Sequence, residues 1–200
     1  MRGNGGKERC RGRARVLDGG MPTVRLVPLP PTAMQALIDE DLIRASEIVG
    51  LELPAGFVDD SWLWRIRIDQ IAADPVSADW VARAVVAEEV VVGHAGFHGP
   101  PDGRGMVEVA YVILPEFRGR GLAVAALAEL LTRADAEPTV QVVRASISPD
   151  NAASLAVVRR FGFSPAGEQW DEEDGWELLF ERPVPGDRES DAPLPTGESR

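Results

Sequence analysis

The stretch Val112-Ile-Leu-Pro-Glu-Phe-Arg-Gly-Arg-Gly-Leu-Ala123 leads from an apolar strand through a Gly/Arg loop into an Ala/Leu-rich helical segment. The first amides of a helix have no partner within the helix, and the helix dipole places partial positive charge there, so an anion is favoured. Gly119 and Gly121 allow the backbone to come close to such a ligand. The stretch therefore predicts a phosphate-binding junction between strand and helix.

Two common phosphate-binding motifs do not fit this loop. A P-loop has four residues between its glycines and a following Lys-Ser/Thr, and neither is present here. A dinucleotide-binding fingerprint needs a third glycine and a downstream acidic residue, which this loop also lacks. On the loop alone, a tight strand-helix connection without a ligand stays open.

The elements around the loop define the fold class. Apolar periodicity and turn residues predict an opening strand near Val24, helices over Ala33–Val49 and Asp59–Ile71, strands over Trp80–Ala87, Val90–Phe97 and Val107–Leu114, a helix over Gly119–Ala134, a strand over Val140–Ile147, a helix over Asn151–Phe161, and strands over Phe163–Gln169 and Trp176–Arg182. Asp59 and Asp60 are candidate N-caps, and Glu88 with Glu89 forms a hairpin turn. A meander combined with crossover helices predicts an α/β (α+β) domain around a mixed, mostly antiparallel sheet.

Composition limits the classes of partner. The chain has 200 residues and a formal net charge of -11, which argues against a nucleic-acid partner. It has no apolar run long enough to span a membrane and no signal-peptide pattern, so we expect a cytoplasmic protein. Its single cysteine, Cys10, excludes a disulfide framework and a cysteine-based metal site.

The two ends of the chain differ from its middle. Residues 1–20 are rich in Gly and Arg and predict a disordered basic tail, with Met21 as an alternative natural start. Residues 183–200 predict a second disordered tail, which leaves residues 21–182 as one domain.

Two motifs together resemble those of a known family. Arg118-x-x-Gly121-x-Ala123 resembles the R/Q-x-x-G-x-G/A signature of GNAT acetyltransferases. Asn151-Ala-Ala-Ser154, followed by Gly162-Phe163, is similar to the ending typical of the ribosomal-protein alanine acetyltransferase branch. The resemblance implies the GNAT fold, with helices on both faces of the sheet and a splayed central strand pair. It also implies acetyl-CoA as co-substrate and no metal.

The resemblance assigns the coenzyme contacts. It implies that the pantetheine arm pairs with the strand at Tyr111, Val112 and Ile113. It implies that the pyrophosphate lies on Arg118, Gly119, Arg120, Gly121, Leu122 and Ala123. It adds Asn151 and Ser154 at the start of the second helix, although Asn151 is equally readable as a simple N-cap.

Catalysis by direct attack of an amine on the thioester needs a base, an oxyanion donor and an acid. The oxyanion donor is expected to be the N–H of Val112 or Ile113. Many GNAT enzymes carry an acidic Tyr seven residues after the helix-start Asn, where this chain has Val158, so the branch resemblance moves the acid role to Ser154. Glu108 and Glu168 are the candidate bases, with water as the alternative.

The remaining conspicuous residues have mostly structural interpretations. His94 and His98, four apart in a strand, would lie ~13 Å apart and cannot share a metal, so both are expected to be structural. Trp62 and Trp64 are core residues or line the acceptor site. The acidic turn over residues 171–174 is either a solvated loop or an attractant for a cationic amine.

The sequence thus predicts an N-acetyltransferase whose acceptor is a small-molecule amine or a protein N-terminus. A non-catalytic acyl-CoA-binding or interaction module is the alternative, and an RNA-associated factor that uses the basic tail is a third. The sequence leaves open whether the protein forms a homodimer.

Overall fold

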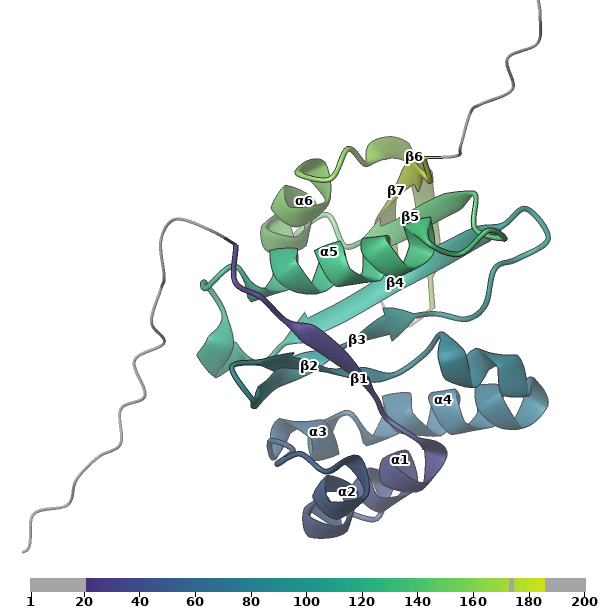
Figure 1. The fold of residues 1–200 in the computed structure, drawn as a ribbon. Helices are drawn as coiled ribbons and strands as arrows, with labels where there is room; N and C mark the ends of the chain where they lie inside the picture. Colours follow the sequence, from purple (N-terminus) through teal and green to yellow (C-terminus); the bar gives the residue numbers. More distant parts are fainter. Residues whose placement is uncertain (1–20, 173–174, 186–200) are drawn as a thin grey trace, which may run out of the picture.

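The computed structural model describes residues 21–172 and 175–185. Seven strands form one sheet in the order β1-β2-β3-β4-β5-β7-β6 (Figure 1). The strands are β1 Arg25–Pro28, β2 Arg83–Ala87, β3 Val90–Phe97, β4 Met106–Ile113, β5 Val142–Ile147, β6 Ser164–Asp171 and β7 Gly175–Pro183. Neighbours run antiparallel except β4 and β5, which are parallel. The predicted α/β class and mostly antiparallel sheet are confirmed.

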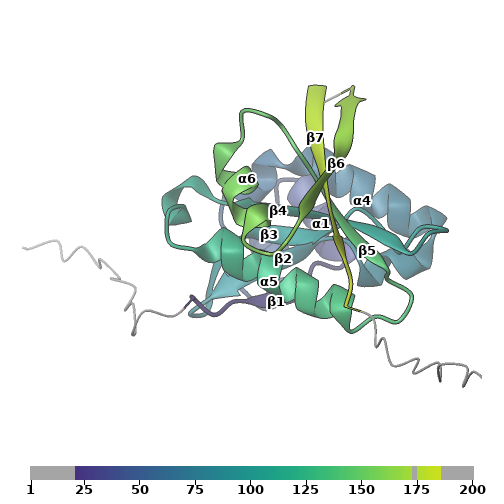
Figure 2. The same ribbon diagram turned by 90° about the horizontal axis from the view of Figure 1, so that it is seen from above.

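Helices cover both faces of the sheet (Figures 1 and 2). The first group is α1 Pro31–Ile38, α2 Leu42–Val49, α3 Gly56–Asp59 and α4 Ser61–Ala73. The second group, on the opposite face, is α5 Leu122–Asp135 and α6 Ala152–Arg159. Short 3-10 turns η1 Pro75–Asp79 and η2 Pro115–Phe117 precede β2 and α5.

Each face of the sheet has its own apolar core, and the strand alternation decides which side chain goes where. Val107, Val109 and Ile113 of β4 pack into the core beneath α5. Because successive side chains of a strand point to opposite faces, Glu108 and Val112 face the side of α1–α4. The residues of β4 are thereby divided between the two faces.

The helix predicted over Ala33–Val49 is wrong as a single element. The chain breaks between α1 and α2, where Glu40 adopts a left-handed φ of 59°. Asp41 begins α2, because its carboxylate accepts a hydrogen bond from Arg44 N at 2.9 Å. The acidic run thus starts a new helix where apolar periodicity alone indicated continuity.

Asp60 precedes α4 but forms no side-chain cap, so that part of the capping prediction is wrong. Its carboxylate instead lies 3.0 Å from Nε2 of the buried His94, whose ring packs edge-on against Phe57 and Trp64. His94 therefore ties α4 to β3 in the core, as its structural interpretation requires. Trp64 is fully buried, whereas Trp62 is half exposed.

The hairpin predicted between β2 and β3 is present, with Glu88 and Glu89 both at positive φ. Within the described residues, no helix is long and apolar enough to cross a membrane. The predictions for the tails and for Cys10 concern residues outside the described ranges, apart from Pro183 to Pro185.

Candidate active site

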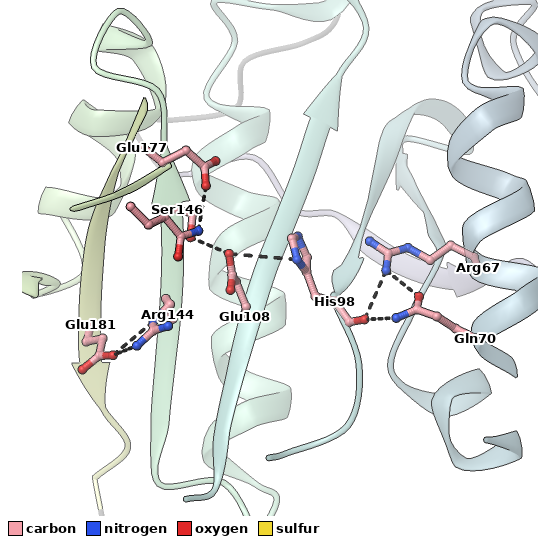
Figure 3. A network of polar contacts seen from close by, with 9 residues as sticks. Arg67, Gln70, His98, Glu108, Arg144, Ser146, Glu177 and Glu181 are labelled. Carbon is pink, nitrogen blue, oxygen red and sulfur yellow. Dashed lines mark hydrogen bonds and ion pairs between the residues drawn. The ribbon is translucent and has the colours of Figure 1, made fainter. Parts of the chain in front are cut away.

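The sheet divides between its two parallel strands. Pairing of β4 with β5 ends at Glu108 opposite Arg144. Beyond that point β4 stays paired with β3, and β5 stays paired with β7. The open edge, defined here as residues 109–113 of β4, therefore faces β5 without pairing to it, which is the predicted splayed central pair (Figure 3).

The register decides which amides point into the open edge. In an antiparallel pair, alternate residues direct both backbone groups at the partner strand. Leu114 N donates to Val92 O, and Glu108 O accepts from His98 N, so the even-numbered residues of β4 face β3. Val112 is even-numbered, and its amide faces β3. The N–H groups of Tyr111 and Ile113 face the open edge, which removes Val112 from the two expected oxyanion donors.

The loop after β4 is held by its own arginine. Arg118 Nε donates to Ile113 O at 2.8 Å, across the end of the open edge. Gly119 and Gly121 adopt φ values of 75° and 76°, which side chains rarely tolerate. Gly121 is the N-cap of α5 and has no side chain with which to cap it, so the first-turn amides of Leu122 and Ala123 are left for a ligand.

A concavity of about 510 Å³ lies beside the start of α5. It is lined by Met21, Pro22, Arg120, Gly121, Val124, Arg160 and Phe161. Two arginines from different elements thus flank the helix start, and the Arg120 guanidinium also lies over the Phe117 ring. Positive charge and free amides make this the most favourable described place for a phosphate group.

The start of α6 lies on the same face. Asn151 Oδ1 accepts a hydrogen bond from Ser154 N at 3.0 Å, so Asn151 is an N-cap, as its simpler interpretation stated. Val158, where the family signature often has Tyr, is fully buried in the core. Ser154 stands in the first turn of α6, close to the Tyr111 hydroxyl.

Glu108 is the centre of a polar network on the other face (Figure 3). The Ser146 hydroxyl donates to Glu108 Oε1 at 2.5 Å, and His98 Nδ1 lies 4.0 Å from the same oxygen. The backbone carbonyl of His98 accepts hydrogen bonds from Arg67 and Gln70 of α4, which fixes the position of the histidine. Three separate elements therefore place a carboxylate, a hydroxyl and an imidazole together.

Burial lowers the pKa of His98, the Glu108 carboxylate opposes this shift, and the Arg67 charge adds to the lowering. Because 52% of the His98 side chain is exposed, solvent screens these charges. The imidazole is accordingly neutral at pH 7 and able to accept a proton.

Sequence reasoning missed the contributions of His98 and Ser146. The sequence predicts a structural His98, yet the residue lies just after β3 and its Nδ1 is 4.0 Å from Glu108 Oε1 of β4. Ser146 lies two residues after Arg144 and so shares its face of β5, a relation visible only once the parallel register is known. Strand pairing was the missing information.

Glu168 stands apart from this network. It lies exposed on the edge strand β6, and β5 and β7 separate it from β4, a distance of about 14 Å at ordinary strand spacing. The neighbouring Trp170 and Trp176 are exposed and pack edge-on at 5.8 Å. Of the acidic turn, Asp171 and Glu172 are described, whereas residues 173–174 lie outside the described ranges. In the part of the chain that the structure covers, no cluster of three or more potential metal ligands occurs.

Comparison with known proteins identifies similar sequences and folds. Residues 31–164 match the family model of the acetyltransferase (GNAT) domain. The uncharacterized N-acetyltransferase YjdG of Bacillus subtilis (strain 168) is 33% identical over 73 residues, a match that spans 36% of this chain and only 44% of that relative.

Solved structures share the fold at lower identity. The ribosomal L7/L12 alpha-N-protein acetyltransferase RimL in complex with coenzyme A has a TM-score of 0.58 at 18% identity, covering 81% of this chain and 94% of that one. The microcin C7 self-immunity acetyltransferase MccE, in complex with acetyl-CoA and AMP, has a TM-score of 0.57 at 14% identity, covering 81% and 93%. Mycobacterium smegmatis RimJ in complex with CoA-disulfide has a TM-score of 0.58 at 19% identity, covering 80% and 82%.

Proposed function

Because the chain belongs to the GNAT acetyltransferase family, we propose that it transfers an acetyl group from acetyl-CoA to a primary amine by direct attack of the amine on the thioester. The observation that carries the proposal is the open edge of β4, which leads directly into the glycine loop and the uncapped start of α5. An extended arm with a phosphate at one end matches this arrangement of free strand edge and free helix amides.

The coenzyme sites follow from the backbone. We assign the pantetheine arm to the open edge, where Tyr111 and Ile113 direct their amides outward and Val112 contributes only a side chain. The pyrophosphate is assigned to the stretch Arg118, Gly119, Arg120, Gly121, Leu122 and Ala123. The free first-turn amides of α5 are consistent with a ligand in this position.

Asn151 and Ser154 complete the proposed coenzyme site. Asn151 acts indirectly, because its side chain is committed to the Ser154 amide. We place the Ser154 hydroxyl, which lies beside the Tyr111 hydroxyl, near the thioester of the coenzyme. At this position Ser154 is proposed as the acid that protonates the leaving thiolate.

Glu108 is the favoured base. An attacking amine has a pKa of about 8 to 10, so it must lose a proton before or during attack. Glu108 is hydrogen-bonded to Ser146 where β4 and β5 part, and the neutral imidazole of His98 lies beside it with half of its side chain in solvent. Glu108 can therefore take the proton, directly or through water, and His98 can pass it to solvent. Glu168 lies too far from this point to share the task with Glu108 in one conformation.

The oxyanion formed during attack needs a donor on the open edge. Ile113 and Tyr111 supply outward N–H groups there, and we assign the role to Ile113, whose carbonyl is already fixed by Arg118. Fixing one side of the residue holds its peptide groups in place, so little reorganisation is needed when charge develops.

The acceptor is proposed to be a small-molecule amine or a protein N-terminus. RimL is described as a ribosomal L7/L12 alpha-N-protein acetyltransferase and MccE as a microcin C7 self-immunity acetyltransferase, which supports keeping both acceptor types in the proposal. Residues 21–182 are proposed as the catalytic domain, active in the cytoplasm without a metal or nucleic acid. The net charge of -11 is suited to cationic acceptors.

The test is release of the coenzyme A thiol in the presence of a panel of amines and N-terminal peptides, with the product identified by mass. Thiol release that depends on one acceptor, together with acetylation of that acceptor, is the expected result. Binding of acetyl-CoA without acetylation of any amine would instead support the non-catalytic acyl-CoA-binding module.

A further inference from the structure

Arg67 of α4 is a buried arginine without a carboxylate partner. Only 9% of the residue is exposed, and among the described residues no Asp or Glu forms an ion pair with it. Burial lowers the pKa of its guanidinium, and no described carboxylate opposes this shift. Because arginine stays charged in proteins, the fold keeps a desolvated positive charge that its own described residues do not neutralise.

The contacts of Arg67 leave one edge of its guanidinium free. Nη1 donates to Gln70 Oε1 at 2.6 Å and to the backbone carbonyl of His98 at 3.1 Å. Nε and Nη2 donate to no described group. Neither of them belongs to the fully enclosed polar atoms that lack a partner in the described structure, so the Nε–Nη2 edge reaches solvent.

This free edge is the one that suits a carboxylate. Nε and Nη2 of an arginine point their N–H groups in the same direction and bind a planar anion through two hydrogen bonds. The chain contains an example, because Nε and Nη2 of Arg144 donate to Glu181 Oε1 at 3.1 and 2.5 Å. In Arg67 the same edge is open, and a carboxylate from outside the chain would complete it.

Arg67 lies beside the proposed base. Figure 3 shows its guanidinium directed from α4 toward His98, whose Nδ1 lies 4.0 Å from Glu108 Oε1. Burial is the main cause of the lowered His98 pKa, the Glu108 carboxylate opposes it, and the charge of Arg67 adds to it. Glu177 of β7 and Asp171 of β6 also raise the His98 pKa. Carboxylates thus lie on one side of His98 and the Arg67 cation on the other.

The surface between Glu108 and Arg67 is open to solvent. On the α1–α4 face of the central strand β4, Glu108 and Ala110 are only half-buried and Val112 is 39% exposed. His98, which separates the carboxylate from the guanidinium, has 52% of its side chain exposed. An acceptor on this face can therefore meet Glu108 with one end and Arg67 with the other.

We propose that Arg67 binds a carboxylate of the acceptor, so that the preferred substrate is an amine with a carboxylate a few bonds from its nitrogen, as in an amino acid. This inference rests on the proposed acetyl transfer, because it is Glu108 that receives the amine. The acceptor carboxylate occupies the Nε–Nη2 edge, and the amine lies toward the acidic side of His98. Gln70 is a positioning residue, since it accepts from Nη1 and holds the guanidinium in place.

The first test compares acceptors that differ only in the carboxylate. Glycine, β-alanine and γ-aminobutyrate are each paired with methylamine, ethylamine or propylamine of the same chain length. In the wild type, kcat/KM should favour the acid of at least one pair, and Arg67→Gln should reduce that acid-to-amine ratio by roughly 10- to 100-fold. Comparing the ratio between variants cancels the different pKa values of the two amines.

Arg65→Gln is the matched control, because it removes the same charge from an exposed position of the same helix, and it should keep the wild-type ratio. Arg67→Lys, which keeps the charge but not the planar edge, is the second variant should Arg67→Gln not fold, and it should also lower the ratio. Equal losses for acid and amine would mean that Arg67 only supports the fold, and that result would overturn the proposal.

The source of the carboxylate is tested with peptides. Two peptide amides that begin with serine, followed by aspartate in one and asparagine in the other, extend the comparison to a polypeptide N-terminus. A preference limited to the amino acids supports a small-molecule acceptor, and one limited to the aspartate peptide supports an acidic N-terminus. Wild-type indifference in both series would contradict the carboxylate site.

The second test needs no acetyl transfer. N-acetylglycine, N-acetyl-β-alanine and N-acetyl-γ-aminobutyrate keep the carboxylate, and their primary amides are uncharged controls. Binding of an acid should raise the His98 pKa, because the carboxylate neutralises the charge of Arg67, whereas the amides should not change it. NMR titration of the imidazole measures this, with the signal assigned by His98→Gln, since the chain has two histidines.

The two tests separate this inference from the proposed function. A rise in the His98 pKa that is lost in Arg67→Gln supports the carboxylate site even if no amine is acetylated, in which case the proposed function alone fails. An unchanged His98 pKa with all three acids would overturn the carboxylate site even if amines are acetylated.

Discussion

The Ser146 hydroxyl donates a 2.5 Å hydrogen bond to Glu108 at the last rung before β4 and β5 separate. The contact joins β5 to β4 and fixes the Glu108 carboxylate next to residue 109, where the open edge begins. On the opposite face of the same strand, the Tyr111 ring packs against the core beneath α5 and α6. The carboxylate proposed to take the proton of the attacking amine is thereby fixed where the coenzyme arm is expected to end.

Glu108→Gln should lower kcat by roughly 10²-fold or more, because the amide keeps the hydrogen bond to Ser146 but cannot accept a proton. The acidic limb of the kcat/KM profile against pH should disappear with it. Glu181→Gln is the matched control, since Glu181 is a partly buried carboxylate that pairs with Arg144 on the adjoining strands. Equal losses in both variants would show that the effect is structural.

His98 should make folding stability depend on pH in a defined direction. Its pKa is lowered in the folded state, so as pH falls through the ordinary value of about 6.5 the unfolded chain binds the proton first. Stability therefore falls with decreasing pH in that window, and it levels off once the folded imidazole is also protonated. Urea unfolding of the wild type and of His98→Gln at several pH values gives the free energy of unfolding as a function of pH. The variant should lose part of this pH dependence. Identical slopes would contradict the assignment.

Asp60→Ala should destabilise the fold by about 1–3 kcal/mol, because it leaves the buried His94 ring without its polar partner. Asp69→Ala, an exposed change on the same helix α4, should alter stability by less than about 0.5 kcal/mol. The acetyl-CoA dissociation constant should be unchanged in both variants, since neither residue lines the coenzyme site. A stable Asp60→Ala protein would mean that His94 is satisfied in another way.

A chain that begins at Met21 should retain full turnover, because residues 1–20 are predicted to lie outside the domain. A chain that begins at Thr23 should bind acetyl-CoA more weakly, since Met21 and Pro22 line the concavity beside the α5 start. Isothermal titration compares the two. If the chain that begins at Met21 turns over clearly more slowly than the full-length chain, the domain boundary lies closer to the N-terminus.

Much of the fold could be predicted from local pattern. The glycine loop and the β2–β3 hairpin follow from short stretches whose chemistry is local, whereas the splayed parallel strand pair follows only from the family resemblance. The break at Glu40 could not be predicted, because apolar periodicity continues across it and only the cap at Asp41 interrupts the helix.

The sequence predicts individual residues of the candidate site but not the contacts between them. The strand pattern predicts Glu108 as a candidate, but its partner Ser146 lies 38 residues away on β5 and its partner His98 follows β3, and only the strand register brings them together. The same register turns the Val112 amide toward β3 and leaves Ile113 as the donor. Pairing between distant strands is a property of the folded chain and has no local signature.

Binding of acetyl-CoA to two glycine variants tests the central assignment most directly. Gly119 and Gly50 have nearly equal positive φ values, 75° and 71°, and no atom lies within 4 Å of an added Cβ at either position. Gly119→Glu and Gly50→Glu should therefore lose similar stability, about 1 kcal/mol from the left-handed backbone. Only Gly119→Glu places a carboxylate where the pyrophosphate is expected. Calorimetry should show loss of acetyl-CoA binding for Gly119→Glu and wild-type affinity for Gly50→Glu. Wild-type affinity in both folded variants would contradict the coenzyme site at the start of α5, and with it the proposed acetyl transfer.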